Sequence, residues 1–327
     1  MNYRRAFVAL AVASLQVCPL TLMGQAGRVR RIAFLGSGSS TSGRHLQNEF
    51  TRVLQELGWI VGRNLVLDER YAEGDPMLAA SLTMELLALK PEVFVSSLDG
   101  YARRAADTDK SLPIVFILGF DPVGLGLVKS LAVPGGNATG FSILNYELNA
   151  KRLSLLKEAV PHLDKVGMLY REGDTNAEAA LKVTEQAGRD LRISIVPAPI
   201  RGADDISPAF QRLAVSGAKG VMNVPEALFF KLRQKLAELA IQHRMAAAFG
   251  ATEYADAGML MAYGTDFKAI FARAAPLVDR LLKGANPANI PVEQANIYEL
   301  VLNLRTARTL GVDLPRSLML QATRIIE

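Results

Sequence analysis

Short apolar runs and longer amphipathic segments alternate along almost the whole chain. Residues 114–118 read Ile-Val-Phe-Ile-Leu, a short run rich in β-branched side chains that is typical of a buried strand. Residues 45–57 place Leu46, Phe50 and Leu54 on one side of a helix. We expect further strands at residues 31–35, 65–71, 93–97, 138–142, 165–170, 193–200, 220–224, 246–249 and 258–264. We expect further helices at residues 77–89, 101–108, 123–131, 148–160, 177–188, 206–215, 227–243, 267–282 and 299–310.

This alternation predicts an α/β fold, because a helix after each strand returns the chain so that the next strand lies parallel to it. The pattern occurs before residue 142 and again after it, and 327 residues suit two domains better than one. The two halves share little residue identity, so only the architecture is repeated. We therefore predict two doubly wound parallel-sheet lobes with a ligand cleft between them, where the carboxyl ends of the strands meet.

The first 26 residues differ in kind from the rest. Arg4 and Arg5 precede an apolar stretch, and small residues stand before a possible cleavage site after Ala26. This pattern predicts a secretory signal peptide over residues 1–26, with a retained membrane anchor as the alternative. The single cysteine, Cys18, lies inside this segment, so the mature chain is expected to have no disulfide and no thiolate ligand. Export without disulfides fits the periplasm.

Residues 111–142 carry the most specific pattern. They read SLPIVFILGFDPVGLGLVKSLAVPGGNATGFS, with a Gly-Phe-Asp-Pro break after the strand and a Pro-Gly-Gly-Asn turn before the next one. This segment resembles a family of ABC-transporter substrate-binding proteins that share a PIVF–DPV–GLV–SLA–PGGN–TG pattern. The family includes proteins described as binding tryptophan or other aromatic amino acids. Residues 54–59, 151–158 and 290–294 also resemble the family, in the family's order.

The resemblance implies a periplasmic binding protein type I-like architecture. Its lobes would be residues 27–142 plus about 250–284, and residues 143–249 plus about 285–327. The strand at residues 258–264 would return to the first lobe. The chain would pass between the lobes near Ser142, Phe249 and Ala285.

Candidate ligand contacts follow the first-lobe strands. Gly36-Ser37-Gly38 after a strand invites a dinucleotide-binding interpretation, but the third glycine position is Thr41, and no acidic residue stands at the required distance. A polar loop at a helix N-terminus can instead accept a carboxylate or another hydrogen-bond acceptor. The first-lobe candidates are Ser37, Gly38, Ser39, Ser96, Ser97, Asp99, Phe120 and Asp121. Asp99 either caps a helix or binds an amine, and Asp121 either shapes the turn before Pro122 or faces the cleft.

The second-lobe candidates also follow strands. They are Tyr170, Asn176, Asn223, Glu226, Glu253 and Tyr254. Tyr170 can stack on an aromatic ligand, and Asn176 either hydrogen-bonds the ligand or caps the following helix. Glu253 lies at an expected strand end, where a carboxylate can pair with an amine. We expect Phe229 and Phe230 to be core residues.

Several classes of chemistry find no support in the sequence. The formal charge of +5 is mild and scattered, without a basic run that would indicate nucleic-acid binding. Histidines stand only at positions 45, 162 and 243, with no zinc-ligand spacing, and no catalytic motif is found. We therefore expect no enzyme activity, no cofactor and no metal.

The function expected from the resemblance is solute binding in the periplasm. A small molecule, amino-acid-like or aromatic, would close two lobes by a hinge motion. The closed protein, expected to be a monomer, would dock onto an ABC permease in the inner membrane. Asp99 and Glu253 slightly favour an amine-bearing ligand. The first alternative is a periplasmic sensor subunit that serves a receptor. A nucleotide-dependent oxidoreductase is a much less favoured alternative. A transcriptional regulator of the same architecture would need a DNA-binding headpiece where the signal segment stands.

Overall fold

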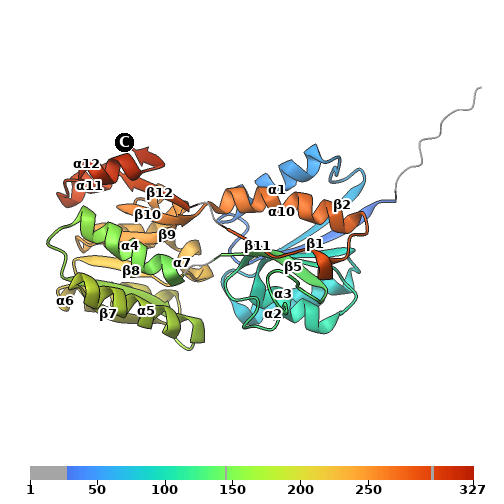
Figure 1. The fold of residues 1–327 in the computed structure, drawn as a ribbon, viewed down its shortest axis with the longest axis horizontal. Helices are drawn as coiled ribbons and strands as arrows, with labels where there is room; N and C mark the ends of the chain where they lie inside the picture. The colour runs from blue at the N-terminus through green and yellow to red at the C-terminus, as the bar shows by residue number, and fades with distance from the viewer. Residues whose placement is uncertain (1–27, 144–145, 296–297) are drawn as a thin grey trace, which may run out of the picture.

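The computed structural model describes residues 28–143, 146–295 and 298–327. The segment expected to be a signal peptide, with Cys18, lies outside the described residues. The rest forms two lobes, each built on its own sheet, as Figure 1 shows. The predicted α/β class with two predominantly parallel sheets is confirmed.

The first lobe contains the sheet β11-β5-β4-β3-β1-β2. Its strands are β1 (Arg30–Gly36), β2 (Leu65–Tyr71), β3 (Val93–Leu98), β4 (Ile114–Gly119), β5 (Ala138–Ser142) and β11 (Glu293–Gln294). Helices α1 (Arg44–Glu56) and α10 (Phe267–Leu282) pack together over one face. Helices α2 (Pro76–Ala88) and α3 (Asp99–Thr108) cover the other.

Strand β1 shows why the sheet is buried on both faces. Ile32 and Phe34 pack into the cluster under α1 and α10, while Ala33 and Leu35 pack into the cluster under α2 and α3. Successive side chains of a strand point to opposite faces, so a strand covered on both sides must be apolar throughout. The continuous apolar runs seen in the sequence follow from this arrangement.

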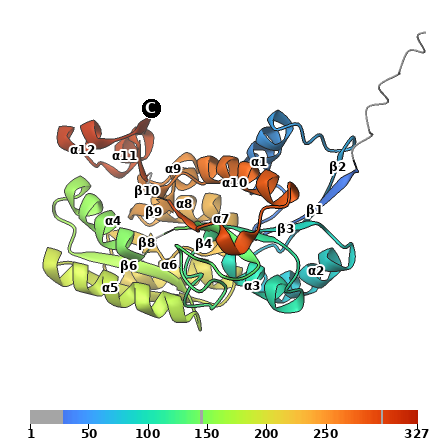
Figure 2. The same cartoon turned by 45° about the vertical axis from the view of Figure 1, so that its right-hand side comes forward.

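The second lobe contains the sheet β13-β12-β10-β9-β8-β6-β7. Its strands are β6 (Lys165–Arg171), β7 (Ser194–Ile200), β8 (Gly220–Asn223), β9 (Ala246–Ala251), β10 (Met261–Thr265), β12 (Tyr298–Asn303) and β13 (Arg324–Ile326). Helices α4 (Tyr146–Ala159) and α5 (Thr175–Leu191) pack on one face. Helices α6 (Ile206–Val215), α8 (Arg233–Gln242) and α9 (Thr252–Asp256) pack on the other. Figure 2 shows the short C-terminal helices α11 (Leu304–Leu310) and α12 (Arg316–Gln321) at the far end of this lobe.

The expected return of strand 258–264 to the first lobe is wrong. Strand β10 pairs parallel with β9 and antiparallel with β12, so it belongs to the second sheet. The chain crosses back only after Thr265, when α10 packs against α1. The crossing is therefore not near Phe249. The last crossing is not near Ala285 either, because β11 still pairs with β5 at Glu293 and Gln294.

Three expected helices also differ from the structure. Residues 123–131 form consecutive turns, since Pro122 and Gly126, whose φ is +64°, interrupt a helix. The segment 227–243 is split at Leu232 into α7 (Ala227–Lys231) and α8. Residues 299–303 belong to strand β12, because Leu300 and Leu302 pack on one face and Val301 on the other.

Candidate functional site

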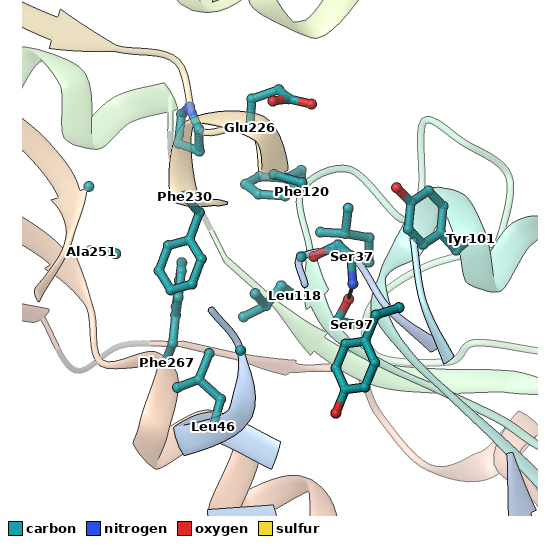
Figure 3. Close-up of a pocket in the computed structure, with 18 of the residues that line it drawn as sticks. Ser37, Leu46, Ser97, Tyr101, Leu118, Phe120, Glu226, Phe230, Ala251 and Phe267 are labelled. Atoms are coloured by element: carbon teal, nitrogen blue, oxygen red, sulfur yellow. Dashed lines mark hydrogen bonds between the residues drawn. The ribbon is translucent and has the colours of Figure 1, made fainter. Parts of the chain in front are cut away.

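A cavity of about 240 Å³ lies between the lobes. Its walls come from the carboxyl ends of β1, β3 and β4 in the first lobe and of β8 and β9 in the second, with residues from α1, α7 and α10. In Figure 3, Phe230, Phe267 and Ala251 lie on one side of it, and Ser37, Ser97 and Tyr101 lie on the other. The position agrees with the rule that open α/β sheets bind ligands beyond their strand ends.

Two serines join the first-lobe loops at the cavity wall. The backbone N–H of Ser37 donates to Oγ of Ser97 at 2.7 Å, which ties the end of β1 to the end of β3 (Figure 3). Ser37, Gly38 and Ser97 all line the cavity, as the sequence predicted for loops at this edge. Phe120, the first residue after β4, lines it as well.

Aromatic rings make up much of the remaining wall. Phe230 meets Tyr254 edge-on with ring centroids 6.0 Å apart, and it lies 6.0 Å from Phe267 of the opposite lobe. Phe34, Tyr71 and Phe271 form a second group of neighbouring rings on the first-lobe side. Such a surface suits a flat apolar or aromatic ligand.

The second lobe also contributes polar groups to the cavity wall. Asn223 ends β8 and is only 1% exposed. Glu226 precedes α7, and its carboxylate accepts a hydrogen bond from the backbone N–H of Leu228. Burial raises the pKa of Glu226, partly offset by its backbone hydrogen bonds and by Arg171. Burial also raises the pKa of the Tyr254 hydroxyl.

Four first-lobe candidates lie outside the cavity lining because their own loops use their polar atoms. Asp99 accepts hydrogen bonds from the backbone N–H groups of Gly100 and Asp121, both at 2.9 Å. The Asp121 carboxylate accepts a hydrogen bond from the backbone N–H of Gly124. This contact matches the first of the two roles expected for Asp121, which is to shape the turn. Ser96 bonds to the backbone of Leu98, and Ser39 bonds to Ser42. None of the four is placed to meet a ligand in the cavity.

The remaining second-lobe candidates have other surroundings. Glu253 faces His45 of the first lobe, with Oε1 3.2 Å from Nε2, and does not line the cavity. Tyr170 packs against the second-lobe core instead of the cavity. The side chain of Asn176 lies outside the described residues. The expected amine-binding roles of Asp99 and Glu253 therefore have no geometric support.

Several lining residues were not anticipated from the sequence. Phe230 was expected to be core together with Phe229; Phe229 is fully buried, but Phe230 is only partly buried and faces the cavity. From the sequence, four further lining residues were expected only as parts of helices or strands, without a role at the cleft: Leu46, Tyr71, Tyr101 and Phe267. The available signal was their position in the first turn of a helix or at the end of a strand, where side chains reach the cleft.

Neither a metal site nor a membrane span is found in the described parts of the chain. No three His, Cys, Asp or Glu side chains within residues 28–143, 146–295 and 298–327 are grouped so that they could share a metal ion. Within the same ranges, every helix is too short or too polar to cross a bilayer.

Comparison with known proteins gives a consistent set of matches. Residues 40–326 match the model of the family described as ABC transporter substrate binding protein. A tyrosine-binding protein of Clostridioides difficile is 25% identical over 264 residues, which cover 80% of this chain and 75% of that protein.

Solved structures agree with the fold. A conserved domain protein of Vibrio cholerae superposes with a TM-score of 0.84 at 26% identity, covering 91% of this chain and 100% of that one. An ABC domain of Streptococcus pneumoniae in complex with L-Trp gives a TM-score of 0.83 at 22% identity, covering 91% of this chain and 99% of that one. The two-lobed fold is thus shared with these solved structures.

Proposed function

Because this chain belongs to the ABC transporter substrate binding protein family, we propose that it captures one small aromatic or amino-acid-like solute between its lobes for import. The observation that carries the proposal is the cavity itself. It lies between the lobes and is walled mainly by aromatic and aliphatic side chains from both. The names of its relatives, a tyrosine-binding protein and a domain in complex with L-Trp, point to the same class of ligand.

The size of the cavity is consistent with this class. An apolar cavity of roughly 150 Å³ in another protein takes up benzene. A volume of about 240 Å³ leaves room for one aromatic ring system with a short polar chain.

We propose that the lobes close over the solute by a hinge motion. Several contacts already join them at the rim. Nζ of Lys231 lies 2.7 Å from Oε2 of Glu73, and an N–H of Arg233 donates to the carbonyl of Ser42 at 3.5 Å. A ligand that touches both walls binds the closed form more tightly than the open form, which is the condition for ligand-driven closure.

Export and delivery are further parts of the proposal. The signal-like segment at residues 1–26 supports export to the periplasm with cleavage near Ala26. Family membership supports an ABC permease in the inner membrane as the partner of the loaded protein, which we propose acts as a monomer.

A ligand screen tests the proposal. The mature chain is unfolded and refolded to remove any bound solute, and its thermal unfolding is followed with aromatic amino acids, aliphatic amino acids, sugars and nucleotides. Stabilisation by aromatic compounds alone is expected, because a ligand that binds only the folded state raises the unfolding temperature. Stabilisation by a nucleotide, without any effect of aromatic compounds, would contradict the proposal.

A further inference from the structure

A tight turn of the first lobe, residues 72–74, meets helix α7 of the second lobe, which Figure 1 shows at the boundary between the lobes. Gly74 has a φ of +76°, a conformation that glycine adopts without strain. A Cβ added to Gly74 would lie 3.3 Å from both N and Cα of Leu228, the second residue of α7. Ordinary contacts between carbon atoms are about 3.5–4.0 Å. The two lobes therefore approach this closely because residue 74 has no side chain.

A charged side chain of the second lobe holds the same turn. Nζ of Lys231, the last residue of α7, lies 2.7 Å from Oε2 of Glu73. The same ammonium donates to the backbone carbonyl of Glu73 at 3.3 Å. An ammonium carries three donors, so one side chain can hold both oxygens at once. The backbone approach at Gly74 and the ion pair at Glu73 thus form one contact between the lobes.

The first-lobe half of this contact is tied to the cavity wall. The backbone N–H groups of residues 72, 73 and 74 donate to the carbonyls of Gly36, Gly38 and Ser37, at 2.8, 3.0 and 2.8 Å respectively. Gly36, Ser37 and Gly38 all line the cavity. Because three backbone hydrogen bonds join them, the turn and the loop after β1 form one unit.

The second-lobe half is tied to the opposite wall. Pro225, Glu226 and Ala227 line the cavity, and α7 begins at Ala227. The Glu226 carboxylate accepts a hydrogen bond from the backbone N–H of Leu228, the residue that meets Gly74. Each half of the contact is therefore continuous with one wall of the cavity, and a ligand that touches both walls also brings the two halves together.

We infer that the 72–74 turn and α7 form a latch that holds the two lobes joined over the ligand. This inference rests on the proposed closure of the lobes and goes beyond it, because it names the residues that hold the joined arrangement. Gly74 and Lys231 are positioning residues, since neither lines the cavity. Apparent affinity falls with the fraction of molecules in the binding-competent arrangement, so a broken latch weakens every ligand by the same factor.

Gly74→Asn tests the backbone contact. Asparagine tolerates a positive φ better than most residues, so local strain stays small while its side chain meets Leu228. Gly62→Asn is the matched control, because Gly62 has a φ of +82° in the same lobe and a Cβ there meets no atom within 4 Å. By isothermal titration calorimetry we expect Gly74→Asn to bind tyrosine and tryptophan about fivefold more weakly or worse, by the same factor for both. Gly62→Asn should bind both as the unaltered protein does.

Lys231→Met tests the ion pair from the other lobe. Methionine keeps an unbranched side chain and removes the ammonium. Lys235→Met is the matched control, because Lys235 is an exposed lysine of α8 in the same lobe and does not pair with Glu73. We expect Lys231→Met to bind both amino acids about two- to fivefold more weakly, the range of a partly exposed ion pair, and Lys235→Met to bind them unchanged.

Small-angle X-ray scattering of the ligand-free proteins gives a readout that does not depend on the identity of the solute. None of the latch contacts involves a ligand, so we expect part of the ligand-free population to have its lobes joined. Gly74→Asn and Lys231→Met should both have a larger radius of gyration than the unaltered protein. The two control variants should match the unaltered protein.

The outcomes separate this inference from the proposal beneath it. An unchanged radius of gyration and unchanged affinity in both latch variants, relative to their controls, would overturn the latch. Loss of affinity for only one of the two amino acids would overturn it as well, because a latch does not distinguish ligands. If neither amino acid binds the unaltered protein, the proposed ligand class fails, and the scattering comparison still decides the latch. If Gly74→Asn does not fold, Lys231→Met and its control decide it.

Discussion

At the scale of single residues, buried carboxylates in this protein serve different purposes according to what satisfies their oxygens. Burial raises the pKa of both Asp99 and Glu226. Asp99 directs its oxygens at backbone N–H groups of Gly100 and Asp121, so it braces the loops that follow β3 and β4. Glu226 keeps unused acceptor capacity at the cavity wall. The first is a structural group and the second is a candidate ligand contact.

The brace formed by Asp99 should have a measurable pH dependence. A carboxyl group whose pKa is higher in the folded state favours folding below its unfolded pKa, near 3.8, and loses that contribution as the pH rises through the folded value. The free energy of unfolding of the wild type, relative to Asp99→Asn, should therefore increase when the pH is lowered from 7 to 4. Urea denaturation of both proteins at several pH values measures this difference in the free energy of unfolding. A relative stability that instead increases toward neutral pH would contradict this account.

The cavity wall gives a second prediction at this scale. Phe120→Ala removes a ring from the cavity, and we expect at least tenfold weaker binding of aromatic ligands, which is about 1.4 kcal/mol. Tyr170→Leu is the comparison, because Tyr170 packs against the second-lobe core outside the cavity. By calorimetry, the Tyr170→Leu variant should bind aromatic ligands with an affinity within twofold of that of the wild type. A larger loss of affinity in Tyr170→Leu than in Phe120→Ala would mean that the ligand lies elsewhere in the cleft.

At the scale of elements, the close approach of β9 and β10 depends on glycine. A Cβ at Gly264 would lie 1.7 Å from the carbonyl oxygen of Gly250, and neither backbone can move without shifting a central strand. Strand β9 ends in Gly250 and Ala251, which line the cavity. The packing of two strands thus fixes one wall of the site.

Gly264→Ala should lower the free energy of unfolding by about 1–3 kcal/mol, the usual range for overpacking in a core. Gly100→Ala is the matched control, because a Cβ there meets no atom within 4 Å and the residue lies in the first turn of α3. It should be neutral or slightly stabilising. Equilibrium denaturation in urea compares the two. Equal stability of both variants would show that the strands can separate without cost.

Most elements could be predicted from the sequence because short apolar runs, such as residues 32–35 and 114–118, alternate with amphipathic segments of ordinary helix length. The prediction failed where a local pattern was ambiguous. Leu300, Val301 and Leu302 are apolar in either conformation, and only the cap formed by Asn303, whose side chain accepts from Thr306, marks the true start of α11. The pairing of β10 with β12 depends on residues far apart in sequence, which periodicity does not report.

The site could be predicted only as a set of strand ends. Ser37, Ser97, Phe120 and Asn223 were found because they directly follow or complete a strand. Whether a polar side chain at such a position faces the cavity or its own loop is decided by nearby backbone N–H groups, as Asp99 and Asp121 illustrate. Aromatic lining residues on helices, such as Phe230 and Phe267, look like core residues in the sequence.

At the scale of the whole molecule, the lobes are joined by contacts independent of any ligand. His45 of α1 faces Glu253 of α9, and Glu73 pairs with Lys231. Because these pairs are partly exposed, each contributes about 0–1 kcal/mol of stabilising free energy. They join the two lobes in this structure without selecting the ligand.

Glu253→Gln should therefore weaken binding of all aromatic ligands by the same factor, up to about fivefold. Asp256→Asn is the control, because Asp256 lies on the same helix but pairs with Arg324 of its own lobe at 2.6 Å. It should leave affinity unchanged. Selective loss of amine-bearing ligands in Glu253→Gln would assign Glu253 a direct ligand contact and contradict this role.

Native mass spectrometry of the gently purified mature protein tests the central claim most directly. The account predicts one small molecule per chain, released on denaturation, whose fragments identify an aromatic or amino-acid-like compound. A nucleotide or a sugar in its place would contradict the account. So would a protein that arrives empty and gains no bound mass after incubation with tyrosine or tryptophan.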